Sequence, residues 1–197
     1  MKIGVDNGHG IGCPNGSPDK QLMEWRWSRE IASRVVGELQ ARGYDSFLLT
    51  PEREDIGINK RVARVNKLCH LYGKDKVMVV SIHSNASGGA PGWHSAQGWN
   101  VLVAKNAGNG SRSLATILTE RAAIEGRPIM HPKNGQMYWE RDDLGILCRT
   151  LCTAVLTESG FHDNRIDMKW LLSDEGKAAC VRIHVDGIVK YLESQGQ

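Results

Sequence analysis

The chain has 197 residues, of which 41% are hydrophobic and 24% are charged, and its formal net charge is +3. No dense run of Lys or Arg marks a nucleic-acid interface, so we expect no nucleic-acid partner. No apolar run reaches the roughly 18 residues that a membrane span needs, so we expect no membrane-spanning segment. The length suits one domain with a single core, and we expect the five scattered cysteines to stay reduced.

Strand-like apolar runs alternate with helical patterns along the chain. In chain order we expect a strand at residues 2–6, a helix at 22–41, a strand at 44–50, a helix at 59–72, strands at 77–82 and 98–104, a helix at 111–125, strands at 144–148 and 154–157, and a helix at 175–193. This alternation is typical of an α/β sheet with helices on its faces. Residues 126–143 follow no period, and we expect them to fold over a groove as a substrate-contacting loop.

Three of the predicted strands run into a polar residue that can bind a metal. His9 follows the first strand in VDNGHG, His83 follows the third in SIHSNA, and Glu158 follows the last in VLTESG. Because ligands of an open α/β sheet bind outside the carboxyl ends of its strands, we expect these side chains to meet. Gly8 and Gly10 would let the backbone turn sharply and would leave room around His9.

A carboxylate in the first predicted helix completes a possible metal site. Glu24 lies in the first turn of that helix, so His9, Glu24 and His83 would form the two-histidine, one-carboxylate set of catalytic zinc sites. Glu158 would then be free to exchange a proton. Each residue also has an ordinary interpretation, because a strand-end histidine is commonly packed or hydrogen-bonded and a first-turn glutamate stabilises the helix dipole. The pattern alone leaves a zinc site and a structural cluster both open.

The order of these motifs resembles the type-3 family of N-acetylmuramoyl-L-alanine amidases, zinc-dependent enzymes that cut the amide between muramic acid and the peptide stem of peptidoglycan. VDNGHG is similar to the family's first motif, which usually has proline where Asn7 stands, and KRVARVNKL, SIHSNA and VLTESGFHDN are similar to its later motifs. The resemblance covers nearly the whole chain. It implies a single-domain α/β fold with a twisted, mainly parallel sheet of about six strands flanked by helices, and a short Asp-containing helix after the last motif.

The resemblance also implies a site and a reaction. His9, Glu24 and His83 correspond to the ligands of one Zn²⁺, and Glu158 corresponds to the catalytic glutamate. The implied reaction hydrolyses the amide between N-acetylmuramic acid and L-alanine, so peptidoglycan is the expected partner and residues 1–197 are the expected catalytic amidase domain.

We expect a monomer that acts on the bacterial cell wall. The start, MKIGVDNGHG, lacks the apolar segment of a signal peptide. We therefore expect a protein made in the cytoplasm and released like a phage-type lysin, or a mature fragment of an exported precursor.

Four further residues are candidate substrate contacts: Asn85, His94, Arg149 and His162. Asn85 belongs to the SIHSNA motif, His94 lies in the glycine-rich segment after it, and His162 follows Glu158 by four positions. Arg149 follows a strand-like run and would meet a carboxylate of the peptide stem, although a surface salt bridge explains it equally well.

Other residues have two interpretations. The segment of residues 88–101 is longer than the corresponding step in the family, and its Trp93 and Trp99 either line the cleft or pin an exposed loop. Asp6 either orients His9 or caps the following turn. The charged run at residues 141–143 is interpreted as a solvated face.

Two other functions are compatible with this pattern. The chain would be a zinc peptidase or deacylase if it cut another amide, and a wall-binding domain if it kept the fold without turnover. The presence of all four polar positions argues against a binding domain, because a degenerate site would be free to lose Glu158.

Overall fold

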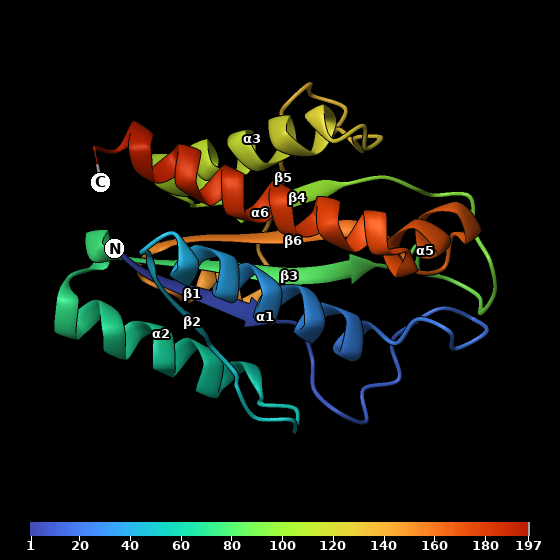
Figure 1. Cartoon of the computed structure of the whole chain (residues 1–197), viewed down its shortest axis with the longest axis horizontal. Coiled ribbons are helices and arrows are strands. Elements are labelled where there is room, and N and C mark those ends of the chain that lie inside the picture. Colours follow the sequence, from blue (N-terminus) through green and yellow to red (C-terminus); the bar gives the residue numbers. More distant parts are fainter. Residues whose placement is uncertain (197) are drawn as a thin grey trace.

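The structure is a computed structural model that describes residues 1–196. Within these residues a six-stranded sheet runs through the molecule, and helices cover both of its faces (Figure 1). The strands are β1 Lys2–Asn7, β2 Asp45–Leu48, β3 Val77–Asn85, β4 Asn100–Ala104, β5 Trp139–Arg141 and β6 Thr153–Phe161. The helices are α1 Glu24–Ala41, α2 Ile58–Tyr72, α3 Asn109–Ile124, α4 Gly145–Cys148, α5 Arg165–Leu172 and α6 Asp174–Ser194, and a short 3₁₀ helix, η1, covers Lys74–Lys76.

The strand order is β2-β1-β3-β6-β4-β5. All neighbouring pairs are parallel except β4 and β6, which are antiparallel. The mainly parallel α/β sheet flanked by helices is therefore confirmed. Since β1, β3 and β6 are parallel neighbours, their carboxyl ends lie side by side at one edge of the sheet.

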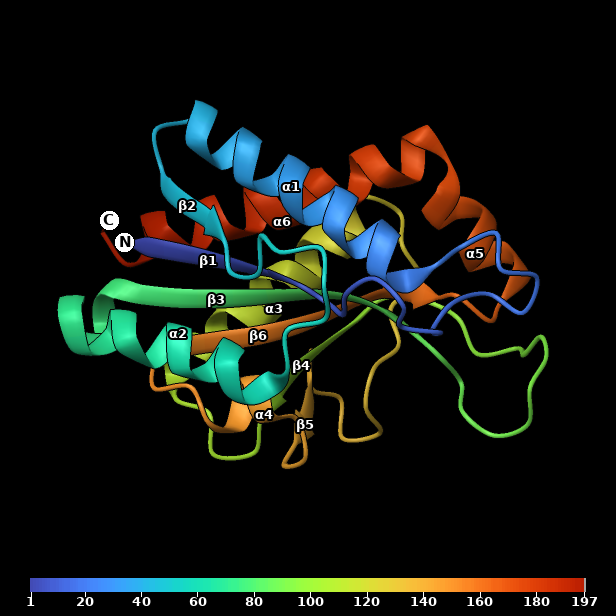
Figure 2. The ribbon, with the colours of Figure 1, turned by 90° about the horizontal axis from the view of Figure 1, so that it is seen from below.

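Both faces of the sheet are buried, which explains why its strands are apolar without a break. On one face, Val80 and Val155 pack with α1, α3 and α6. On the other face, Val79 and Leu156 pack with α2 and α4. Figure 2 shows α1 and α6 on one side of the sheet and α2 and α4 on the other. No helix in residues 1–196 is both long enough and apolar enough to cross a membrane.

Two short elements differ from the prediction. Residues 144–148, expected as a strand, form helix α4, whose Ile146 and Leu147 are buried against the α2 face. A run of four or five apolar residues fits a strand and a buried helical turn equally well, so only its packing decides. Strand β5 lies inside the segment that was predicted as a loop, where three residues pair with the outer edge of β4.

Several element boundaries also moved, and those of α1, β3 and β6 bear on the site. Helix α1 begins at Glu24 and not at residue 22, because both backbone groups of Leu22 bond to Ser17: Leu22 N donates to Oγ at 3.0 Å, and Leu22 O accepts from Ser17 N at 2.8 Å. Strand β3 continues to Asn85 and β6 to Phe161, each further than predicted. The two strands extend each other by pairing, which a single strand's sequence does not show.

A buried carboxylate ties the end of β6 to its neighbours. Asp167 of α5, which is 1% exposed, accepts hydrogen bonds from Gly98 N at 2.7 Å, Phe161 N at 2.9 Å and Arg127 Nη2 at 2.7 Å. The Arg127 guanidinium stacks over the Trp170 ring at 3.7 Å. This network fixes the strand that carries Glu158.

Replacement of Asp167 by alanine should lower the free energy of unfolding by roughly 3–5 kcal/mol, because it leaves the Arg127 charge and two N–H groups buried without partners. Urea unfolding followed by circular dichroism measures this change. Asp45→Ala is the control, since Asp45 pairs with Lys2 on the surface at 2.6 Å and should matter little. Equal effects of the two substitutions would contradict the assigned role of the network.

Candidate active site

Three neighbouring strands bring the sequence-predicted residues together. His9 lies two residues beyond the end of β1, and His83 in β3 is paired in register with Glu158 in β6. The sequence pattern placed His83 and Glu158 after their strands, but in the structure both residues lie inside the strands, near the carboxyl ends. A register shift between His83 and Asn85 marks an irregularity in β3 at this point.

The turn after β1 is made by His9 itself. Its φ of 60° lies in the left-handed region. Gly8 and Gly10, in contrast, do not adopt a left-handed backbone. The glycines instead allow close approach: a Cβ on Gly8 would lie 2.5 Å from the His83 ring, and one on Gly10 would lie 2.2 Å from Asp55 N. The expected clearance is present, but the sharp turn comes from the histidine.

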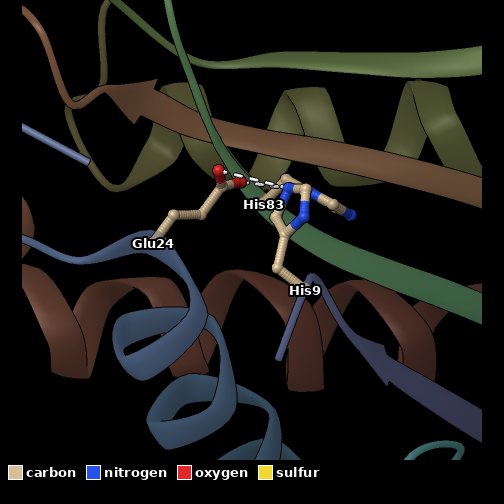
Figure 3. Close-up of side chains that lie close together, drawn as sticks. All are labelled: His9, Glu24 and His83. Atoms are coloured by element: carbon tan, nitrogen blue, oxygen red, sulfur yellow. Dashed lines mark hydrogen bonds and ion pairs between the residues drawn. The ribbon is translucent and has the colours of Figure 1, made fainter. Parts of the chain in front are cut away.

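Glu24 connects the two histidines (Figure 3). His83 Nδ1 donates to Glu24 Oε1 at 3.0 Å, and His9 Nε2 lies 3.4 Å from Oε2. Ser84 N also donates to Oε1, at 3.1 Å. The side chain of Glu24 is 3% exposed, against 30% for His9 and 17% for His83, so the carboxylate forms the floor of the cluster.

The donor atoms of this cluster suit a zinc ion. One atom each from His9, Glu24 and His83 lies within 4.8 Å of the others, and no other such group occurs in the part of the chain that the structure describes. Tetrahedral zinc ligands about 2.0–2.2 Å from the metal lie roughly 3.3–3.6 Å apart. His83 Nδ1 lies 3.0 Å from Glu24 Oε1 and His9 Nε2 lies 3.4 Å from Oε2, so each imidazole is at about this distance from one oxygen of the carboxylate. Two imidazoles and one carboxylate are also ligands that zinc prefers.

Electrostatics within the cluster favour a charged Glu24 and a charged His83. Burial alone would raise the pKa of Glu24, but hydrogen bonds and the charges of His83 and His9 hold that pKa well below its usual range. Burial would lower the pKa of His83, yet the Glu24 carboxylate raises it to about 9. A metal that binds here must displace the His83 proton.

Glu158 is held differently from Glu24. Its Oε2 is buried and has no hydrogen-bond partner among the described residues. Burial raises the pKa of Glu158 to about 8, with His83 lowering it and Glu24 raising it to smaller extents. An unpartnered carboxyl group with a pKa near neutral is suited to exchange protons.

A cavity of about 360 Å³ surrounds the cluster, and we call it the central cavity. Three others share walls with it. The lysine cavity, of about 360 Å³, includes Lys20; the isoleucine cavity, of about 370 Å³, includes Ile56; and the arginine cavity, of about 180 Å³, includes Arg141. Residues that line the central cavity include His9, Glu24, His83, Asn85, Glu158 and His162.

The four candidate substrate contacts fall in different places. Asn85 lines the central and arginine cavities, and His162 lines the central and lysine cavities. His94 lines the lysine cavity only. Arg149 lines none of the four and donates to Asn59 Oδ1 at 2.8 Å.

Sequence analysis missed one residue beside Glu158. Arg141 is exposed, as the interpretation of residues 141–143 as a solvated face expects, and it also lines the arginine cavity together with Glu158. The pairing of β5 with β4 brings it there, and three residues are too few to give a strand pattern. The segment of residues 126–143 also lines this cavity through Met130 and Trp139.

The residues with two interpretations can now be placed. Trp99 is fully buried in the core, Trp93 packs against the Arg165 guanidinium at 4.2 Å, and neither lines the four cavities. Asp6 accepts from Arg61 at 2.7 Å and from Ser81 Oγ at 2.7 Å, so its hydrogen bonds fix the strand and not His9.

A mainly parallel α/β sheet whose strand ends carry a histidine–glutamate–histidine group beside a buried glutamate has the donor set and the proton-exchanging group that a metal-dependent hydrolase needs. The family model for N-acetylmuramoyl-L-alanine amidase matches residues 3–190. The chain belongs to this amidase family, whose members act on peptidoglycan, and the resemblance noted from the motifs is confirmed.

Solved structures of amidases share the fold. An N-acetylmuramoyl-L-alanine amidase from Clostridium difficile 630 is 19% identical with a TM-score of 0.80, covering 98% of this chain and 97% of that one. The amidase Ami1 from Mycobacterium smegmatis is 23% identical with a TM-score of 0.78, covering 98% and 97%. The catalytic domain of an endolysin targeting Clostridia difficile is 22% identical with a TM-score of 0.73, covering 96% and 97%. Comparison with curated protein sequences gave no match.

In chelator-treated, metal-free protein, Glu158→Gln should gain stability relative to the wild type as the pH rises. Glu158 stays protonated in the folded protein up to about pH 8 but ionises near 4.5 when unfolded, so its contribution is present below pH 4.5 and is lost as the pH rises toward 8. The difference should grow by up to about 1.4 kcal/mol per pH unit between those values.

Urea unfolding at pH 5 and pH 8 measures this difference. Glu38→Gln, at an exposed position of α1, is the control and should give the same small difference at both values. A difference for Glu158→Gln that does not change with pH would contradict the assigned protonation.

Proposed function

We propose that this chain is a zinc-dependent hydrolase of the amide between N-acetylmuramic acid and L-alanine, and that residues 1–197 form a single catalytic domain. The observation that carries the proposal is the group of His9, Glu24 and His83 next to the unpartnered oxygen of Glu158. Family membership supplies the substrate class, because the family acts on peptidoglycan. The site supplies the residues for the chemistry.

In this proposal one zinc ion is held by His9, Glu24 and His83. When bound, a zinc ion lowers the pKa of water to roughly 7 and polarises a carbonyl group as a Lewis acid. Glu24 is well suited to hold the ion, because its buried carboxylate already contacts both histidines and Ser84 N fixes its orientation. Gly8 supports the same arrangement by leaving space for the His83 ring.

Glu158 moves the proton in this mechanism. It accepts a proton from the water that attacks the lactyl carbonyl carbon, and it then donates this proton to the nitrogen of the leaving L-alanine as the amide bond breaks. Its position opposite His83 supports this role, because both side chains line the central cavity. Burial raises the pKa of Glu158 to about 8, and the positive charge of a zinc ion held nearby would lower it, so that the carboxylate would be ionised and able to accept a proton near neutral pH.

Asn85 and His162 are proposed to contact the substrate around the scissile bond. Both line the central cavity with Glu158, and Asn85 Oδ1 is held by Ala86 N at 2.8 Å. His94 is proposed to contact substrate further away, in the lysine cavity. Arg149 stays a prediction from the sequence, since its hydrogen bond to Asn59 favours a structural role.

In the cell, we propose that the protein acts as a monomer on the bacterial cell wall, as a lysin released by another protein or as a processed export product. The endolysin catalytic domain among the similar folds is compatible with this role.

Digestion of purified sacculi tests the reaction and its metal. The protein should release stem peptides that begin with L-alanine and leave the glycan strands intact, lose this activity with a chelator, and regain it with added zinc. Mass spectrometry of the soluble products is the measurement. A different cut bond would favour a peptidase or deacylase, and intact sacculi with zinc present would favour a wall-binding domain.

The role of Glu158 is tested by Glu158→Gln, which keeps the shape but cannot exchange a proton. Turnover of sacculi should fall by at least about 100-fold, because general acid–base catalysis supplies factors of that size. Zinc content, measured by atomic absorption, should stay at the wild-type value, since Glu158 is outside the proposed ligand set. Glu38→Gln should be fully active, and an active Glu158→Gln enzyme would contradict the assignment.

A further inference from the structure

The lysine cavity is continuous with the proposed reaction site. It is formed by the loop before α1, the glycine-rich segment after β3 and the residues that follow β6, and it shares Ala86 and His162 with the central cavity. Figures 1 and 2 both show the loop before α1 and the segment after β3 at the same end of the sheet. A substrate held at the central cavity can therefore extend into the lysine cavity.

Among the lysines and arginines that line the four cavities, Lys20 is the one without an acidic partner. The isoleucine cavity contains Arg61, which is neutralised by Asp6 at 2.7 Å and Asp55 at 3.1 Å. The arginine cavity contains Arg141, which pairs with Asp143 at 2.6 Å. Among residues 1–196 Lys20 has no acidic partner, and its Nζ donates only to a carbonyl, Pro14 O, at 3.0 Å. An anionic group that enters the lysine cavity therefore meets an ammonium without an acidic partner, in a lining that also includes the Asp163 carboxylate.

The backbone at Lys20 is strained in a way that glycine would relieve. Its φ is 58°, and His9 is the only other non-glycine residue with positive φ in the described chain. A left-handed residue with a side chain costs roughly 1–2 kcal/mol. The loop holds this conformation through Lys20 N, which donates to the carbonyl of buried Ser17 at 2.9 Å. The position thus carries a long cationic side chain where glycine would be more stable, which points to a role for the charge.

The other ionisable groups of the lysine cavity already have partners. Both carboxylate oxygens of Asp163 accept from Ser87, at 2.7 Å from its N–H and 3.2 Å from its hydroxyl. His94 Nε2 bonds to a carbonyl at 2.9 Å, and His162 Nδ1 lies 3.0 Å from a serine hydroxyl. The remaining donors of the Lys20 ammonium are the free charged donors of the cavity.

We propose, resting on the function proposed above, that the lysine cavity binds a carboxylate of the peptide stem and that Lys20 is the residue that recognises it. The carboxyl group of muramic acid forms the carbonyl side of the scissile amide and is not free. The free carboxylates near that bond therefore belong to the peptide stem. An extended residue spans about 3.3–3.6 Å, so the first residues after L-alanine reach a neighbouring cavity. Lys20 then orients the leaving peptide and favours acidic stems over amidated ones.

Sacculi with altered stems test this inference. One portion is treated with carbodiimide and ammonia, which converts the stem carboxylates to primary amides, and a second portion is left untreated. The initial rate of L-alanine amino-group release is measured for both at limiting substrate. The wild-type enzyme should cut the amidated sacculi about five-fold more slowly, the factor that corresponds to about 1 kcal/mol for a partly exposed ion pair.

Variants at Lys20 separate recognition from folding. Lys20→Gln and Lys20→Gly should cut both substrates at the same rate, near the wild-type rate for amidated sacculi, whereas Lys20→Arg should keep the preference. Lys20→Gly should also unfold at a higher temperature than the wild type, because it relieves the left-handed strain. The control is Lys67→Gln, at an exposed lysine of α2 that lines none of the four cavities.

The outcomes are distinguishable. A preference for untreated sacculi that persists in Lys20→Gln and Lys20→Gly, or a wild-type enzyme that cuts both substrates equally, would overturn the inference and leave the proposed function standing. Failure of the wild-type enzyme with zinc to release L-alanine amino groups from either substrate would overturn the proposed function itself.

Discussion

The hydrogen-bonded pair of Glu24 and His83 is the contact on which the site depends. A carboxylate that is 3% exposed is stable only if its charge is compensated, and His83 and Ser84 N supply that compensation. The pair joins the first turn of α1 to the C-terminal part of β3, and His9 lies 3.4 Å from the same carboxylate. The buried pair sets where the helix meets the sheet, and the histidine–glutamate–histidine group proposed to hold zinc follows from that position.

Other buried charges around the site are compensated in the same way. Arg61 holds Asp6 and the loop beyond β1, and Arg127 holds Asp167 and the end of β6. Because these pairs satisfy the structural charges, Glu158 stands out as a carboxyl group with a buried oxygen that the fold does not use. The proposed catalytic group is thus separated from the structural groups by its lack of partners.

Left-handed backbone at non-glycine residues also occurs at the candidate site. His9 and Lys20 are the non-glycine residues with left-handed backbone among residues 1–196, and both line cavities at the candidate site. Each conformation is maintained by close packing or hydrogen bonds of its loop, as at Gly8 and Ser17. Strain of this kind persists only where the surrounding structure enforces it, and it is concentrated at functional sites, which supports the roles proposed for both residues.

The sequence by itself determined the α/β class and the long helices, and it picked out His9, Glu24, His83 and Glu158 as candidate site residues, because periodicity and short motifs are local properties of the chain. Only the tertiary structure decided that residues 144–148 form a helix, that β5 exists and that β4 runs antiparallel to β6. It also decided which charges are paired, and so distinguished Lys20 from the arginines. Strand pairing and ion pairing join residues far apart in the chain, and no local pattern records such partners.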